Sequence, residues 1–136
     1  MRKELERRLV ERWPKWFNTE GDIRCTAMPR GFEHDDGWFD IVWRLCEDLE
    51  PLVAQFEKET GLPFEVLQVK EKFGGLRFYV NCRRNEAISR RIGIAADEFF
   101  HTCEVCGQPG TLRENRCIKT LCDEHVGATR GRHWLR

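Results

Sequence analysis

The sequence lacks several features that would assign it to a large class of proteins. No stretch approaches the roughly 18 consecutive apolar residues of a transmembrane helix. Residues 1–13 are charged throughout and have no apolar segment of the kind a secretory signal requires, so we expect a cytoplasmic protein. Neither a G-x-S-x-G motif nor a P-loop occurs, and no base is identifiable for Cys25 or Cys46. The sequence therefore offers no pattern typical of nucleophilic catalysis.

The chain also lacks net charge, because 23 Lys and Arg residues balance 23 Asp and Glu residues. A neutral total argues against a polycation that coats nucleic acid along its whole length. The charges are unevenly distributed: residues 1–68 hold 10 basic and 15 acidic residues, and residues 69–136 hold 13 basic and 8 acidic residues. This asymmetry suggests a partner of matching charge, unless the two halves face each other inside one domain.

Three segments have the apolar periodicity of helices, in a chain whose 136 residues suit one ordinary domain. Residues 2–13 form the first, which Pro14 should end. Residues 38–60 form the second and longest, with Pro51 inside the pattern, so we expect a kinked helix or two consecutive ones. Residues 84–100 form the third.

Residues 64–81 predict a β-hairpin that turns at Gly74-Gly75. A two-residue loop pairs Val69 with Val80, and a four-residue loop pairs Val69 with Phe78. Both loops place the same apolar side chains on one face: Leu67, Val69, Phe73, Leu76, Phe78 and Val80. The opposite face carries Gln68, Lys70, Lys72, Arg77, Tyr79 and Asn81.

This basic hairpin face has two interpretations. Lys70, Lys72 and Arg77, with Tyr79 beside them, suit phosphate contacts and the stacking of a base. Alternatively, the cations lie on a solvated strand face and protect an edge strand against aggregation.

Four of the seven Cys residues lie within residues 103–122, in a C-x2-C pair followed after 15 residues by C-x2-H. Such pairs bind a single zinc ion, because a tight turn directs both ligands inward. We assign one structural Zn²⁺ with four protein ligands: Cys103, Cys106, Cys122 and His125. A complete ligand set leaves no open position for water, which indicates a structural rather than a catalytic site. His101 and Cys117 are the possible substitutes.

Residues 31–65 contain 10 acidic and 2 basic residues. Phe39 and Trp43 lie off the apolar stripe of the helix there, so they are candidate contacts with a basic protein partner. The alternative is that these rings are buried. At the start of the stretch lies an acidic cluster that suits either a helix N-terminus or a hard cation: Glu33, His34, Asp35, Asp36 and Asp40.

The segments GWFDIVWRLCEDLEPL (37–52), FEVLQVKEKFGGLRFYV (64–80) and CEVCGQPGTLR with TLCDEH (103–125) resemble a group of small, uncharacterised bacteriophage and prophage proteins. VKEKFGGLRFY is the most distinctive part of the likeness. The resemblance implies no activity. It does imply an accessory phage protein in the bacterial host cytoplasm, a context in which proteins often bind host factors, including defence systems.

We therefore expect an α+β protein with three or four helices, a β-hairpin and a C-terminal zinc ribbon-like module. Residues 1–101 should form the helical domain with its hairpin, residues 102–126 a zinc-binding module packed on it, and residues 127–136 a basic tail. The leading hypothesis is a non-enzymatic, zinc-stabilised protein that binds another protein. The alternative is a nucleic-acid-binding protein that uses the basic hairpin face and the zinc module. A metal-dependent hydrolase built on the acidic cluster would require Asp35, Asp36 and Asp40 to converge on one cleft.

Overall fold

The computed structural model describes residues 1–114 and 117–126, and it confirms the expected α+β class. The elements in chain order are α1 (Lys3–Arg12), η1 (Met28–Arg30), β1 (Phe32–Glu33), η2 (Asp36–Trp38), α2 (Phe39–Thr60), β2 (Val66–Lys72), β3 (Gly75–Val80), α3 (Glu86–Phe99), β4 (Thr111–Glu114) and β5 (Ile118–Leu121). Within these described ranges, no helix combines the length and the apolar character needed to cross a membrane. The predicted basic tail, residues 127–136, lies outside the described residues.

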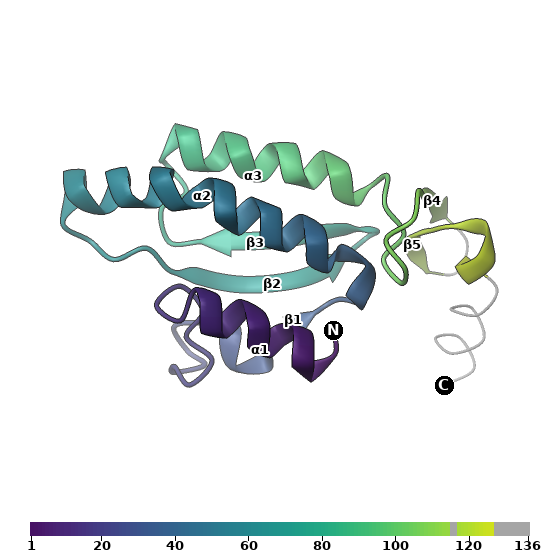
Figure 1. Cartoon of the computed structure of the whole chain (residues 1–136), viewed down its shortest axis with the longest axis horizontal. Coiled ribbons are helices and arrows are strands. Elements are labelled where there is room, and N and C mark those ends of the chain that lie inside the picture. The colour runs from purple at the N-terminus through teal and green to yellow at the C-terminus, as the bar shows by residue number, and fades with distance from the viewer. Residues whose placement is uncertain (115–116, 127–136) are drawn as a thin grey trace.

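Two small sheets organise the molecule. The first has the order β1-β2-β3, with β1 parallel to β2 and β2 antiparallel to β3. The second is the antiparallel β4–β5 ribbon. Figure 1 shows α2 and α3 along one side of the β2–β3 hairpin, and the β4–β5 ribbon at the end of the molecule where that hairpin turns. The C-terminal ribbon therefore lies against the tip of the hairpin.

The helices form where the apolar periodicity predicts them. Helix α1 ends one residue before Trp13, in agreement with the stop expected from Pro14. Helix α2 is a single 22-residue helix with Pro51 inside it, rather than two consecutive helices. Asn85 caps α3, because its side chain accepts a hydrogen bond from the Ile88 N–H. One core cluster joins α1, α2, α3 and the first sheet.

The expectation that Phe39 and Trp43 are free for a partner is wrong for Phe39, which is 7% exposed. The Trp43 ring is half-buried and packs edge-on against Trp13, with 4.8 Å between the ring centroids. The Arg8 guanidinium lies over both the Phe39 and the Trp43 rings. Trp13 and Arg8 belong to α1 or its C-cap, so this helix covers the flank of α2 that periodicity alone leaves open.

The hairpin pairs Val69 with Phe78, and the ladder continues to Lys72 and Gly75. The loop is therefore Phe73-Gly74, one residue earlier than predicted. Both loop residues have positive φ, 54° for Phe73 and 84° for Gly74, as a type I′ turn requires. The predicted place of Phe73 on the apolar face is wrong, because its side chain is 60% exposed.

A β-bulge also changes the predicted faces of the hairpin. Val66 pairs with Val80 and Gln68 with Tyr79, so Leu67 is the extra residue on β2. The bulge places Val66 in the core and leaves Leu67 half-buried, whereas the alternation predicts Leu67 in the core. Beyond the bulge the predicted basic face is present: Lys70, Lys72, Arg77 and Tyr79 are all exposed.

Candidate metal centre

Cys103, Cys106, Cys122 and His125 converge, and their ligand atoms all lie within 4.8 Å of one another. The Sγ atoms of Cys106 and Cys122 are 3.7 Å apart. His125 Nδ1 lies 3.2 Å from Cys122 Sγ and 3.8 Å from Cys103 Sγ. The edges of a tetrahedron around Zn²⁺ are about 3.8 Å between sulfurs and about 3.5 Å between sulfur and nitrogen. The four side chains therefore have the spacing that one tetrahedral metal ion needs.

The backbone around the first pair of ligands forms a knuckle. The Gly107 N–H donates to the Cys103 carbonyl over 2.9 Å, and the Gln108 N–H points at Cys106 Sγ over 3.5 Å. Gly107 has φ of 83°, a conformation that residues with a Cβ rarely adopt. The second pair is closed by a helical turn, in which the His125 N–H donates to the Cys122 carbonyl. Both ligand pairs are thus held by local backbone hydrogen bonds.

The clustered thiols influence one another. Burial and the neighbouring thiols of Cys103 and Cys122 raise the pKa of Cys106 to about 11. Desolvation also acts on Cys122, but hydrogen bonds from His125 outweigh it and lower the pKa of that thiol to about 7. A divalent cation among the three sulfurs would stabilise all of them as thiolates. The donor set therefore fits a soft or borderline metal ion such as Zn²⁺.

The two possible substitutes lie apart from this group. Among the described residues, the four predicted ligands are the one cluster with metal-binding spacing. The exposed His101 donates from Nδ1 to the Asp97 carbonyl, and the half-buried Cys117 precedes β5. No family model, curated protein or solved structure matches the chain. What the site and its surroundings do is therefore argued from their geometry.

A buried charge network joins the metal centre to the hairpin tip. Glu104 lies between two ligands, is 3% exposed, and accepts a 3.0 Å hydrogen bond from the Asp35 N–H. Lys119 on β5 lies 3.5 Å from a Glu104 oxygen and 2.8 Å from Glu71 on β2. Glu71 in turn accepts from the Gly74 N–H. Burial raises the pKa of Glu104 to about 7, although Lys119 opposes the shift.

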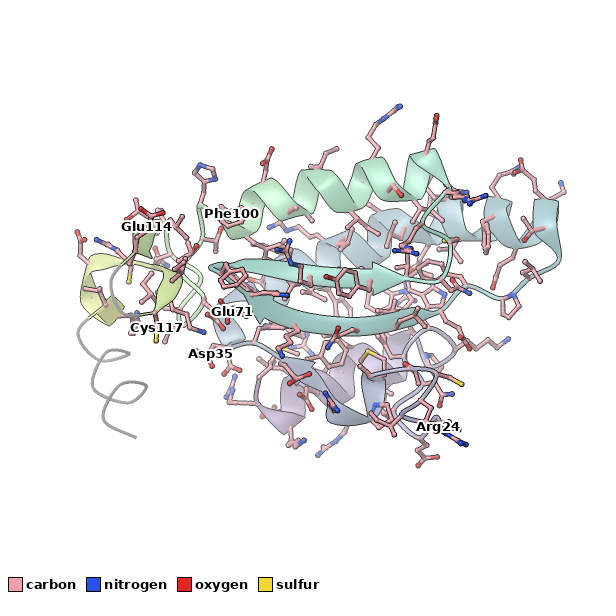
Figure 2. The ribbon with its side chains drawn as sticks, turned by 180° about the vertical axis from the view of Figure 1, so that it is seen from behind. Arg24, Asp35, Glu71, Phe100, Glu114 and Cys117 are labelled. Atoms are coloured by element: carbon pink, nitrogen blue, oxygen red, sulfur yellow. The ribbon has the colours of Figure 1, made fainter. Side chains whose placement is uncertain are left out.

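Three further hydrogen bonds connect the metal-binding segment and the β4–β5 ribbon to the rest of the protein. The Trp38 indole N–H donates to the Thr102 carbonyl over 2.8 Å. The buried Thr120 hydroxyl donates to the Gly74 carbonyl over 2.6 Å. The Gly37 N–H donates to the Glu104 carbonyl over 2.7 Å. Figure 2 places Asp35, Glu71 and Phe100 at the end of the body that faces the β4–β5 ribbon. The spacing of the Cys and His residues in the sequence could not predict these contacts, because the groups that make them come from segments far apart in the chain.

The acidic cluster does not assemble in the way a hydrolase site requires. The Asp36 carboxylate accepts from the Arg2 N–H and forms an ion pair with the Arg2 guanidinium. Asp40 is exposed on the first turn of α2. Asp35 and Asp36 border a shallow hollow with Met1, Arg2 and Val105, and Asp40 is not part of its lining. The predicted convergence of the three aspartates is therefore not observed.

His34 is buried between the Phe32 and Trp38 rings. Its Nδ1 contacts the Asp35 carbonyl, and its Nε2 is buried without a hydrogen-bond partner among the described residues. Burial is the main reason that the pKa of His34 falls to about 4; the positive N-terminus adds to the shift, while the Asp35 carbonyl and the Asp36 charge oppose it. His34 is therefore neutral in the folded protein at neutral pH.

We expect His34 to make the protein less stable in acid. Between pH 6.5 and 4 the unfolded chain binds a proton at this residue and the folded chain does not, so the free energy of unfolding decreases as the pH falls. The loss approaches on the order of 3 kcal/mol. Urea denaturation of wild type and His34→Gln at pH 7 and pH 4.5 measures it, because the other titrating groups are common to both proteins. An equal stability difference at the two pH values would contradict the assignment.

Proposed function

We propose that the chain is a non-enzymatic, zinc-stabilised binding protein whose partner is another protein. The observation that carries this proposal is an exposed apolar patch where the hairpin tip meets the β4–β5 ribbon. The patch comprises Phe73, Phe100, Leu112 and Ile118, which are 60%, 38%, 40% and 37% exposed. They are four of the eight large apolar side chains exposed in the described part of the chain. Such clusters typically mark interaction sites.

The members of the patch are neighbours in space. A Cβ added at Gly74 would lie 2.4 Å from Leu112 Cδ1, and one added at Gly75 would lie 2.6 Å from Phe100 Cζ. The turn backbone thus runs directly over both side chains. Leu112 pairs with Thr120 across the ribbon, and Ile118 lies on the same strand face as Thr120. The metal centre anchors the ribbon, so zinc would determine whether this patch exists.

Phe73 is the strongest candidate for the partner contact. It has φ of 54°, which costs an aromatic residue on the order of 1 kcal/mol or more. A turn of this type favours Asn or Gly at the same position. The protein thus maintains a strained backbone that presents an aromatic ring to solvent, a cost that binding would explain.

The cellular context of the proposal rests on the resemblance to phage and prophage proteins. In that context the chain would act in the bacterial host cytoplasm on a host protein, such as a component of a defence system. The lack of a catalytic role is supported by the metal-binding cluster, whose four ligands all come from the protein.

Phe73→Asn tests the proposal, because it should weaken binding while stabilising the fold. Asn is suited to the type I′ turn, so we expect the free energy of unfolding to rise by roughly 1 kcal/mol. Loss of the ring should reduce partner capture about tenfold. The measurement is affinity capture from bacterial lysate, with and without nuclease treatment, followed by quantitative mass spectrometry, alongside urea denaturation of each protein.

Leu62→Asn is the matched control, because Leu62 is 59% exposed and lies beyond the end of α2, outside the patch. A partner should be retained by wild type and the Leu62 variant and lost from the Phe73 variant. Equal capture by all three proteins would exclude the patch. Capture that disappears with nuclease treatment would favour a nucleic-acid-binding function instead.

A further inference from the structure

The outward face of the β2–β3 hairpin lies on the other side of the sheet from α2. Seen from behind, β2 and β3 lie nearest the viewer, and no helix of the described residues crosses in front of them (Figure 2). Cross-strand pairing places Lys70 opposite Arg77 and Gln68 opposite Tyr79. Lys72 follows two residues beyond Lys70 on the same side of the strand. The five side chains form one continuous surface, the outer face.

This outer face is positively charged. Lys70, Lys72 and Arg77 make no ion pair with any described residue, and all three are exposed. Glu33 of β1, which pairs with Lys70, brings one carboxylate into the same row. Helix α2 lies behind the sheet in Figure 2, and two of its acids are paired with arginines of the other helices: Asp48 with Arg91 of α3 and Glu50 with Arg12 of α1. Part of the charge asymmetry of the sequence is therefore paired inside the molecule, whereas the three cations of the outer face have no ion-pair partner among the described residues.

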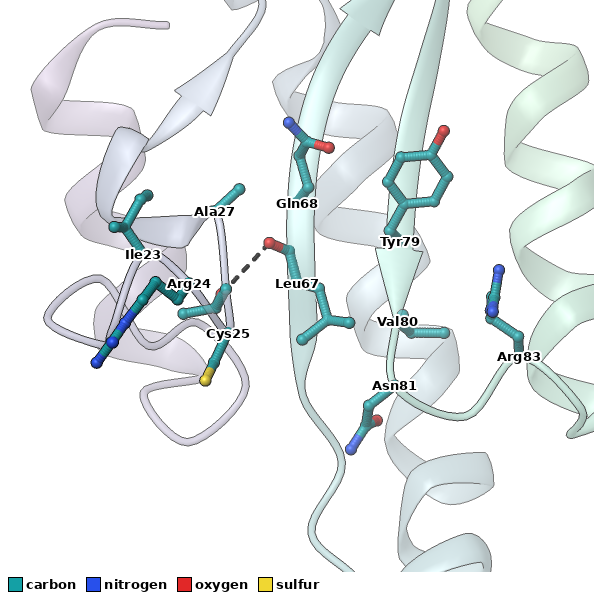
Figure 3. Close-up of a pocket in the computed structure, with 11 residues that line it drawn as sticks. Ile23, Arg24, Cys25, Ala27, Leu67, Gln68, Tyr79, Val80, Asn81 and Arg83 are labelled. Carbon is teal, nitrogen blue, oxygen red and sulfur yellow. Dashed lines mark hydrogen bonds between the residues drawn. The ribbon is translucent and has the colours of Figure 1, made fainter.

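A groove continues the outer face toward the start of β2. It has a volume of about 690 Å³ and lies between the loop that contains Ile23 and Arg24 and the strand residues Gln68 and Tyr79 (Figure 3). Arg83 borders it beyond β3. The loop is fixed to the sheet, because the Ala27 N–H donates to the Leu67 carbonyl over 2.8 Å. The bulge at Leu67 turns that apolar side chain into the groove lining.

We propose that the outer face and this groove form a binding site for single-stranded nucleic acid. Lys70, Lys72 and Arg77 contact phosphates, and the Tyr79 ring stacks on a base that the groove receives. Tyr79 is placed for this role, because it is 44% exposed and belongs to both the cationic surface and the groove. The site adjoins the apolar patch at one point, because the Lys72 ammonium lies over the Phe73 ring, 5.7 Å from its centroid. Lys70, Arg77 and Tyr79 belong to the outer face alone, so nucleic-acid binding there does not require the proposed protein partner.

Single strands fit this arrangement better than a duplex does. A ring can stack on a base only when that base is already unstacked from its neighbours. Three cations on a short two-stranded face neutralise few phosphates, so electrostatics alone would give weak binding that depends steeply on salt. Base stacking then supplies the preference for a single strand, and the amide of Gln68 and the guanidinium of Arg83 offer hydrogen bonds at the groove.

The test is fluorescence anisotropy with 5′-fluorescein-labelled oligothymidylate and oligouridylate of about 20 nucleotides. We expect saturable binding at roughly 50 mM salt that Lys70→Gln/Arg77→Gln weakens about tenfold, with the salt slope reduced by about 1.4. Tyr79→Ala should weaken binding roughly tenfold and leave the salt slope unchanged. A labelled duplex of the same length should bind more weakly than either single strand.

Matched variants elsewhere on the surface distinguish the effect of the site residues on binding from the effect of the protein's net charge. Lys58→Gln/Arg90→Gln removes the same charge from exposed positions on α2 and α3, and Ile94→Ala shortens an exposed side chain on α3. Both controls should bind like wild type. The proposal would be overturned if no anisotropy change occurred at low salt, or if the variants and their controls lost affinity equally. It would also be overturned if the duplex bound as tightly as the single strands, or if poly-glutamate displaced the labelled strand as effectively as unlabelled oligonucleotide does.

Discussion

Removal of the metal is expected to unfold residues 103–126 and to leave the helices folded. The β4–β5 ribbon buries little apolar surface of its own, since Leu112 and Ile118 remain 40% and 37% exposed. The main core cluster extends from Leu5 to Phe99 and includes no residue of the metal-binding segment. A metal ion bound by the four ligands would therefore provide most of the folding energy of this segment, since structural zinc sites bind with roughly 10–16 kcal/mol.

Amide hydrogen exchange with and without a chelator measures this effect. The amides of Cys103, Gly107 and Thr120 should lose protection by several orders of magnitude, and those of α2 should keep theirs. Elemental analysis should give about one zinc per chain for wild type. Cys122→Ser should reproduce the chelated state, whereas Cys25→Ser, which replaces an exposed thiol outside the cluster, should not. A Cys122 variant with bound zinc and protected amides would refute the ligand assignment.

Loss of the metal should also remove contacts that stabilise the hairpin tip. Thr120 donates to the Gly74 carbonyl, and Lys119 pairs with Glu71, which accepts from the Gly74 N–H. Without the ribbon, Glu71 loses its buried counter-charge and the apolar patch loses Leu112 and Ile118. If the proposed function is correct, chelation abolishes capture of the protein partner. Binding of oligonucleotides to the outer face should be less affected, because Lys70, Arg77 and Tyr79 lie on the hairpin itself.

The helices and the metal ligands could be predicted because their signals are local. Helical periodicity locates α2 to within a residue, and two short Cys and His pairs are sufficient to identify the cluster. The burial of Phe39 could not be predicted in this way. Its ring lies off the apolar stripe and is covered by Arg8, whose contact depends on where α1 packs.

In the hairpin, the alternation of apolar and polar residues predicts part of the structure, and the backbone geometry of the bulge and the turn is not predicted. Alternation predicts which side chains of β3 face outward, and the structure agrees for Arg77 and Tyr79. A single bulged residue at Leu67 interrupts the alternation on β2, and the turn begins at Phe73 although Gly-Gly is the preferred turn pair. Gly74 belongs to the turn in either register, and the absence of a Cβ there leaves room for Leu112 and Thr120 of the ribbon.

Gly37→Ala is expected to be among the most damaging single substitutions in the chain. A Cβ at this position would lie 2.2 Å from the Cys103 carbonyl oxygen and 2.5 Å from that of Glu104. Both are backbone atoms in the knuckle that holds the metal, so neither can move without displacing a ligand. The Gly37 N–H also donates to the Glu104 carbonyl, and separation of the two segments would break that bond. We expect a loss of roughly 3 kcal/mol or more in the free energy of unfolding.

Gly93→Ala provides the matched control, because a Cβ there meets nothing within 4 Å and the position lies inside α3. Ala is the better helix former, so this variant should be more stable than wild type by up to about 1 kcal/mol. Urea denaturation and chelator competition distinguish the two substitutions: Gly37→Ala should lower both stability and metal affinity, and Gly93→Ala should leave metal affinity unchanged. Equal stability of the two variants would mean that the 36–38 segment does not pack on the knuckle. A destabilised Gly37 variant with wild-type metal affinity would show that the clash is relieved by movement of the body, and that the metal centre holds its geometry without this support.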